Sequence, residues 1–156
     1  MARHSTEPDY ESLAELRHQI RRFLSFSEQA ARAAGLEPHQ HQLMLAVKGL
    51  PVDARPRIRE LADRLQIQHH SAVELVNRLA KGGYIRRNRD AKDRREVLLA
   101  LTPKGEQVLR QLSLHHKNEL RILGPALLRA LRQVMQQSSS RKPSNNSAGP
   151  KKRVIR

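Results

Sequence analysis

The chain has 156 residues, 38% of them hydrophobic and none of them cysteine. This length suits one domain with its own core and leaves no room for a second, catalytic domain, while the missing cysteines exclude disulfides and thiol-based oxidant sensing. The formal net charge of +15 favours polyanionic partners. The net charge is −1 over residues 1–40, +6 over 41–102, +4 over 103–137 and +6 over 138–156.

Other classes of protein lack support in the sequence. No apolar run approaches the length of a membrane span and no secretory signal is present, so we expect a cytoplasmic protein without a membrane partner. We find no glycine-rich phosphate loop, metal-ligand motif or nucleophile motif. We therefore expect neither an enzyme nor a cofactor.

The N-terminal part predicts one long helix after a flexible segment, residues 1–8. Between residues 9 and 34, apolar side chains recur at helical spacing, and Gly35 ends the pattern. The stripe consists of Leu13, Leu16, Ile20, Phe23, Leu24, Ser27 and Ala31. We expect this stripe to pack against another helix.

Two short amphipathic helices are predicted from residue 58 onward, with a short connection through Gln66 and Ile67 between them. Ile58, Leu61, Ala62 and Leu65 form the stripe of the first, and Ala72, Leu75, Val76 and Leu79 form the stripe of the second. Gly82 and Gly83 favour the end of the second helix and a tight reversal of the chain. The side chains directed away from the core are then His69, His70, Ser71, Val73, Glu74, Asn77, Arg78 and Lys81. This second helix is the candidate recognition helix.

A basic hairpin comes next. Residues 84–89 and 96–101 each have the length of a strand, and the polar run 90–95 joins them. Such a hairpin holds its tip away from the body, where an arginine can enter the narrow minor groove of DNA. Thr102 and Pro103 then suit the start of another helix.

The C-terminal helical region carries a second apolar stripe. Leu120, Leu123, Leu127, Leu131 and Val134 recur at spacings of three and four. Because proline lacks the donor for an interior helical bond, Gly124-Pro125 should break or kink this region, and we expect a helix over about 103–123 and a shorter one over about 125–137. The two terminal stripes either fold back onto the same chain or join two chains, and periodicity alone does not choose between these arrangements.

The whole pattern resembles the MarR family of bacterial transcriptional regulators. The family's Asp-Arg-Arg and Leu-Thr-x-x-Gly motifs match Asp93-Arg94-Arg95 and Leu101-Thr102-Pro103-Lys104-Gly105, and residues 35–45 are similar to its entry into the second helix. The resemblance covers about residues 10–137. Two departures, Gln68 and Glu37 in place of the usual capping residues, weaken local helix capping.

The resemblance implies a mainly α fold with a small β-hairpin wing. It predicts a single MarR-like domain over residues 9–137, in which 38–102 form a winged helix-turn-helix and 9–34 and 103–137 form dimerisation helices. The predicted dimer contacts are Leu13, Leu16, Ile20, Leu120, Leu123, Leu127, Leu131 and Val134. Two-fold symmetry would then place two recognition helices in successive major grooves.

We assign roles within the DNA surface from side-chain chemistry. His69, His70 and Ser71 begin the recognition helix and are candidates for base contacts. Glu74 can accept from cytosine N4, Asn77 can bond bases or the sugar-phosphate backbone, and Arg78 and Lys81 suit phosphates. The plain alternative is a solvated polar face.

The wing residues have roles that the resemblance implies. Arg95 would enter the minor groove, Asp93 would orient its guanidinium, and Arg94 would touch the backbone or an acidic neighbour. Lys92 is a phosphate contact or merely solvated. The resemblance also implies release from DNA by a small aromatic or phenolic effector, with Phe23, Phe26, Met44 and Leu112 as pocket walls or plain core.

Two features remain outside this scheme. Some relatives sense metals through histidines in the regions of His39, His41, His115 and His116, but no histidine pair is spaced i, i+4, so we expect no metal site. The tail, residues 138–156, has a disordered composition and suits an arm that adds phosphate contacts or does nothing.

We therefore predict a homodimeric, sequence-specific regulator of double-stranded DNA, acting as a repressor on a near-palindromic operator. The competing interpretation is an architectural nucleic-acid-binding protein with little sequence preference. A specificity ratio separates the two, because architectural binding is nearly equal across sequences and steeply dependent on salt.

Overall fold

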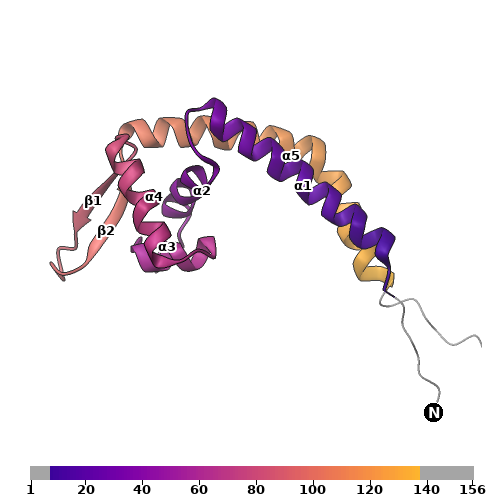
Figure 1. The fold of residues 1–156 in the computed structure, drawn as a ribbon, viewed down its shortest axis with the longest axis horizontal. Helices are drawn as coiled ribbons and strands as arrows, with labels where there is room; N and C mark the ends of the chain where they lie inside the picture. The colour runs from indigo at the N-terminus through magenta and orange to yellow at the C-terminus, as the bar shows by residue number, and fades with distance from the viewer. Residues whose placement is uncertain (1–7, 138–156) are drawn as a thin grey trace, which may run out of the picture.

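The computed structural model describes residues 8–137, which form a helical module attached to a long two-helix arm (Figure 1). The elements are α1 (Tyr10–Ala33), α2 (Pro38–Lys48), α3 (Ile58–Leu65), α4 (His69–Lys81), β1 (Ile85–Arg89), β2 (Val97–Leu101) and α5 (Pro103–Gln137). α1 packs along α5 to form the arm, and the other elements gather near the start of α5. Over residues 8–137, none of the helices is both long and apolar enough to cross a membrane.

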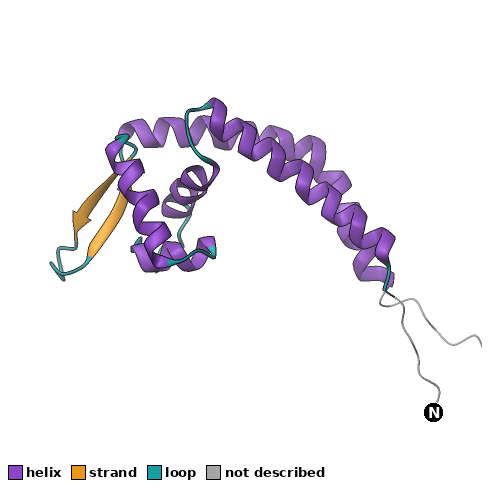
Figure 2. Ribbon diagram, viewed as in Figure 1, coloured by secondary structure: helices purple, strands orange, loops and turns teal. Residues whose placement is uncertain are grey.

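The predicted fold class is confirmed: over residues 8–137 helices dominate, and a two-stranded sheet forms an antiparallel hairpin (Figure 2). The helices predicted at 9–34, 58–65 and 69–81 match α1, α3 and α4. Each strand begins one residue later than predicted.

Both ends of α1 have identifiable caps. The Asp9 carboxylate accepts a hydrogen bond from the backbone N–H of Ser12 at 3.1 Å, which satisfies an otherwise free amide of the first turn. At the other end Gly35 has φ +79°, a left-handed conformation that glycine adopts without strain. The Leu36 N–H then donates back to the Ala31 carbonyl at 3.0 Å, closing the helix.

The turn between α3 and α4 sets the recognition helix at its angle. Gln66 adopts the left-handed conformation (φ 55°), and the Ile67 N–H donates to the Ala62 carbonyl at 3.1 Å. The Gln68 side chain makes no capping bond at the start of α4, as the sequence predicts. Besides this turn, packing against the core of the module holds α4 in place. This core contains Leu43, Met44, Leu61, Val76, Leu79, Ile85 and Leu99, each at most 3% exposed.

The prediction of a break at Gly124-Pro125 was wrong. α5 runs uninterrupted from Pro103 to Gln137 with Pro125 inside it. Pro125 removes only the hydrogen bond to the Arg121 carbonyl, and both residues are exposed, so water can satisfy that acceptor. Packing of α1 along α5 also opposes a break at this point. The arm is consequently a single long two-helix element (Figure 1).

Hydrogen bonds and a cation–π contact hold the start of α5 against the start of the hairpin. The Tyr84 carbonyl accepts from the Thr102 N–H at 3.0 Å, and the Lys104 ammonium lies 4.4 Å from the centre of the Tyr84 ring. The Thr102 hydroxyl donates to the Gly83 carbonyl and accepts from the Gly105 N–H. Gly105 is required here because a Cβ would overlap the Tyr84 carbonyl. The Leu-Thr-x-x-Gly motif thus joins the wing to the arm.

Candidate nucleic-acid interface

The recognition helix α4 divides cleanly into a buried and an exposed side. Ala72, Val76 and Leu79 are fully buried and fix the helix on the core. Six of the seven predicted contact residues are exposed: His69, His70, Glu74, Asn77, Arg78 and Lys81. Ser71 is half-buried, so less of its side chain is available to DNA than the pattern suggested.

The positively charged arginine and lysine side chains of α4 lie at its C-terminal end. Its first turn has no acidic residue, and its last turn carries Arg78 and Lys81. The histidines thus lie at the N-terminal end, where free backbone amides favour an anion. The two cations lie at the other end, near the hairpin. Helix and wing together form a surface suited to a polyanion, with Glu74 as the one acidic side chain on the recognition helix.

The wing tip is a closed, hydrogen-bonded loop. The Asp90 N–H donates to the Glu96 carbonyl and the Glu96 N–H donates to the Asp93 carbonyl, each at 3.0 Å. Asp90 and Asp93 also accept, through their carboxylates, from the backbone amides of Lys92 and Arg95. The backbone of the tip is therefore shaped by its own aspartates. The side chains of Lys92, Arg94 and Arg95 are exposed.

Asp93 does not hold Arg95 in the way that the resemblance implied. Its Oδ1 accepts from the backbone N–H of Arg95 at 3.0 Å, and no ion pair joins it to the Arg95 guanidinium within residues 8–137. This contact positions the backbone of Arg95, and the Arg95 side chain is exposed. Arg94, for its part, accepts at its carbonyl from the Arg89 guanidinium at 3.4 Å.

The pKa of Asp90 reflects this arrangement. The carboxyl accepts from the Lys92 amide, which lowers its pKa below the ordinary value of 3.8 against the opposing effect of burial. The Arg55 guanidinium beside it acts in the same direction. Asp90 is thus held as an anion directly after β1, where the tip of the basic hairpin begins.

Long-range side-chain contacts attach the wing to the helix-turn-helix, and sequence reasoning missed them. Arg87 on β1 donates to the Asn77 side-chain oxygen on α4. Arg55, in the segment before α3, pairs with Asp90 and Glu96 at the two ends of the wing tip. These partners lie 10 to 41 residues apart in the chain. The local periodicity of apolar residues in the sequence cannot predict such pairs.

The arm exposes apolar side chains that its own chain does not cover. Of the predicted dimer contacts, Leu13, Leu120 and Leu131 are 41–47% exposed and Ile20 is 37% exposed. Leu16, Leu127 and Val134 are half-buried, and Leu123 is only 6% exposed because the chain itself covers it. Leu24, which belongs to the predicted N-terminal stripe, is also exposed. Further apolar side chains on the arm that the sequence analysis did not single out are exposed: Tyr10, Leu114, Ile122, Leu128 and Met135.

A histidine pair lies where the arm meets the module. His41 on α2 is 3% exposed and its ring centre lies 4.9 Å from that of His116 on α5. His116 bonds to the Leu112 carbonyl and the Ser27 hydroxyl. Burial lowers the pKa of His41 below its ordinary value, and the neighbouring His116 adds to that effect. Across residues 8–137, no group of three or more metal-binding side chains is present.

A cavity of about 510 Å³ opens beside this pair. It is lined by Phe23, His41, Leu45, Ser113, His116, Lys117, Leu120 and Arg121. Of the pocket walls predicted from the sequence, Phe23 lines it, whereas Met44 and Leu112 are buried core residues. Phe26 contacts the His116 ring edge-on at 5.3 Å between ring centres.

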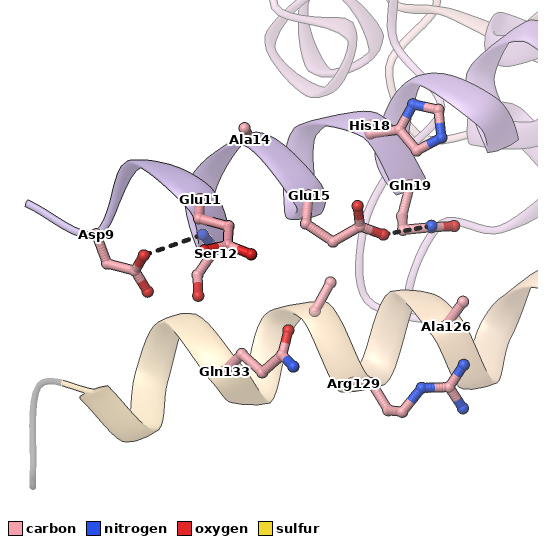
Figure 3. Close-up of a pocket in the computed structure, with 11 residues that line it drawn as sticks. Asp9, Glu11, Ser12, Ala14, Glu15, His18, Gln19, Ala126, Arg129 and Gln133 are labelled. Carbon is pink, nitrogen blue, oxygen red and sulfur yellow. Dashed lines mark hydrogen bonds between the residues drawn. The ribbon is translucent and has the colours of Figure 1, made fainter.

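A larger groove, of about 850 Å³, lies at the far end of the arm between α1 and α5 (Figure 3). Asp9, Glu11 and Glu15 line it from α1 and Arg129 lines it from α5. Glu15 and Asp9 are engaged along their own helix, with Gln19 and Ser12. Its polar lining makes this groove a poorer site for an aromatic ligand than the cavity beside His41.

Comparison with known proteins finds a family with which part of this chain is similar. The MarR family profile matches residues 34–96, which run from the end of α1 to the wing tip. The match covers the helix-turn-helix and most of the wing, and it supports a MarR-family winged-helix protein. Together with the winged-helix fold, this match supports a DNA-binding transcriptional regulator. No curated protein matches the chain by sequence.

Solved structures of MarR-family proteins and other regulators share the fold over most of the chain. The transcriptional regulator Tm0710 from Thermotoga maritima is 25% identical, with a TM-score of 0.57 over 81% of this chain and 95% of its own. AbsC from Streptomyces coelicolor is 21% identical, with a TM-score of 0.65 over 85% and 92%. The repressor CouR, solved on a 23-mer DNA duplex, is 23% identical, with a TM-score of 0.60 over 86% and 99%.

Proposed function

We propose that this chain is a homodimeric repressor that binds a near-palindromic operator sequence-specifically and leaves it when a small aromatic or phenolic ligand binds. The observation that carries the proposal is the surface formed by α4 and the wing. Six predicted contact residues of α4 are exposed beside a basic tip whose backbone is held by hydrogen bonds. A preformed surface of this kind loses little conformational entropy on binding.

The proposed roles divide the surface into base and phosphate contacts. His69 and His70 at the start of α4 would reach base edges first, with Glu74 one turn on. Arg78 and Lys81 would hold phosphates, and Arg95 would enter the minor groove. Phosphate contacts alone confer no sequence preference. Specificity therefore rests on the first turns of α4.

Dimerisation is supported by the exposed apolar side chains of the arm. Isolated apolar side chains on a surface are ordinary, but a succession along one two-helix element favours burial against a partner. A second copy of the chain is the partner we propose. Its two-fold axis would set the recognition helices roughly 34 Å apart, one turn of DNA.

Sedimentation of two variants tests the dimer. Leu131→Glu places a charge on the exposed arm and should shift the protein to monomer at micromolar concentration. Val52→Glu adds the same charge at a fully exposed apolar residue between α2 and α3, away from the arm, and should leave the dimer intact. A wild-type protein that sediments as a monomer would overturn this part of the proposal.

The cavity beside His41 is the proposed effector site. Phe23, Leu45 and Leu120 offer apolar walls, while Lys117 and Arg121 can meet a carboxylate or phenolate. The cavity joins α1, α2 and α5, so a ligand there contacts both the arm and the module. Release of labelled DNA by phenolic acids, and loss of that release in Leu45→Arg, is the expected result, because Leu45 lines the cavity from α2 and is not a predicted dimer contact.

Selection from a pool of random duplexes tests the function directly. A sequence-specific dimer should enrich one motif with two inverted half-sites about one helical turn apart. The architectural alternative predicts no enriched motif and binding that falls steeply with salt for every duplex. Enrichment of a single half-site would support specificity and argue against the symmetric dimer.

A further inference from the structure

One arginine holds both ends of the wing tip. The Arg55 guanidinium donates to the Glu96 carboxylate at 2.7 Å and pairs with the Asp90 carboxylate. Asp90 and Glu96 are the residues at which the tip loop leaves β1 and re-enters β2, and the backbone N–H of Asp90 donates to the Glu96 carbonyl at 3.0 Å. Any rotation of the tip relative to Arg55 must therefore break an ion pair.

The segment that carries Arg55 is itself attached to the sheet. The Leu99 N–H of β2 donates to the Pro56 carbonyl at 2.9 Å, and Arg57 pairs with Glu96 at 2.7 Å. α3 begins at the next residue, Ile58. The wing tip is thus linked, through three consecutive residues, to the first helix of the helix-turn-helix.

We propose that Arg55 is a positioning residue of the DNA-binding surface. By holding Asp90 and Glu96, it sets the direction of the wing tip relative to α4, so that Arg95 meets the minor groove while α4 occupies the major groove. The bond between Arg87 and Asn77 fixes the other side of the hairpin to the recognition helix. The inference rests on the proposed function, because it concerns a DNA contact assigned there to Arg95.

The net charge around Arg55 argues for a positioning role rather than a direct contact with a DNA phosphate. The cluster of Arg55, Arg57, Asp90 and Glu96 has no net charge, so its arginines add little to the attraction for DNA. Asp90 is 8% exposed and the Arg55 side chain is 39% exposed, which places the pair at the edge of the fold. Partly exposed ion pairs contribute little to stability. The expected effect of losing Arg55 is therefore on the orientation of the tip.

Two measurements on the full chain test the role of Arg55. The first is amide hydrogen exchange of residues 90–96 in the DNA-free protein, compared between wild type, Arg55→Ala and Arg59→Ala. Arg59 is exposed on α3 and carries the same charge, and no ion pair within residues 8–137 joins it to the wing. Arg55→Ala should speed exchange at the tip, while Arg59→Ala should leave it unchanged. Circular dichroism checks that each variant is folded.

The second measurement is a double-mutant cycle with Arg95→Ala on the duplex that the wild-type protein enriches from a random pool. Arg55→Ala should weaken binding roughly fivefold or more when Arg95 is present and have little effect when Arg95 is absent. Arg55→Lys should recover only part of the affinity, because an ammonium cannot hold two carboxylates as a guanidinium does. Arg59→Ala should give an effect that simply adds to that of Arg95→Ala.

The outcomes distinguish this inference from the proposed function. If the wild-type protein enriches no duplex, the specific-regulator proposal fails, and the cycle is then run on any duplex that the protein binds at low salt. Equal exchange rates at residues 90–96 in wild type and Arg55→Ala would overturn the positioning role. So would a loss of affinity in Arg55→Ala that is independent of Arg95.

Discussion

Gly105 offers the sharpest test of how the wing is joined to the arm. In the first turn of α5, a Cβ at this residue would lie 3.0 Å from the carbonyl carbon of Tyr84, 3.3 Å from its Cα, and closer still to its oxygen. The obstacle is backbone, which cannot swing aside as a side chain can. We expect Gly105→Ala to force the hairpin and α5 apart.

Two effects of the added methyl group set the free-energy cost of Gly105→Ala. Forcing a methyl group into a packed site costs about 1–3 kcal/mol, and moving the Tyr84 carbonyl weakens its bond from the Thr102 N–H, worth about 1 kcal/mol. A total of about 3 kcal/mol lowers the melting temperature of a domain of this size by roughly 10 °C. This is a large part of a typical unfolding free energy.

Thermal unfolding followed by circular dichroism, at one fixed protein concentration, measures this effect. Gln107→Ala is the matched control, since Gln107 is exposed in the same part of α5 and its loss should change stability by about 0.5 kcal/mol at most. A Gly105→Ala protein that melts within about 2 °C of wild type would refute the argument, because the junction would then tolerate the Cβ.

Three further predictions concern DNA binding and pH. Arg95→Ala should weaken binding roughly tenfold with unchanged circular dichroism, because its side chain is exposed; unaltered affinity in gel-shift titrations would count against the wing contact. Glu74→Ala should alter the motif selected from random duplexes more than the overall affinity, since a carboxylate adds nothing to phosphate attraction. The folded pKa of His41 lies below the ordinary 6.5, so the unfolded chain takes up this proton first and stability falls as pH drops from about 6.5 towards the folded pKa. Each unit by which folding lowers the pKa of His41 removes about 1.4 kcal/mol of unfolding free energy at low pH. The unfolding free energy of His41→Asn, measured in urea, should therefore depend less on pH in this range. An unchanged pH dependence would exclude His41 as its source.

The sequence predicted those parts of the fold that local periodicity determines. The stripes of α3 and α4 depend on residues within two turns of each other, and Gly35 and Gly83 mark reversals with positive φ. The strands followed from short apolar and basic runs. The exposed face of α4 could be identified for the same reason, except that Ser71 is half-buried.

Features that depend on distant partners could not be predicted. Pro125 suggested a break in α5, but packing along α1 keeps the helix continuous, and solvent can satisfy the carbonyl that the proline leaves free. The Arg55 cluster joins segments that are 41 residues apart at Glu96, and an arginine in a basic chain gives no local signal of such a pairing. Asp93 was likewise predicted to orient the guanidinium of Arg95, whereas its carboxylate contacts the Arg95 backbone N–H.

The most direct test of the central claim, sequence-specific recognition of double-stranded DNA, is a comparison of two affinities. Fluorescence anisotropy near physiological salt would measure binding of the wild-type protein to its enriched duplex and to a shuffled duplex of the same composition. The proposed regulator should prefer the enriched duplex by roughly 10³ or more. Equal affinities that fall together as salt is raised would contradict specific recognition and favour an architectural protein.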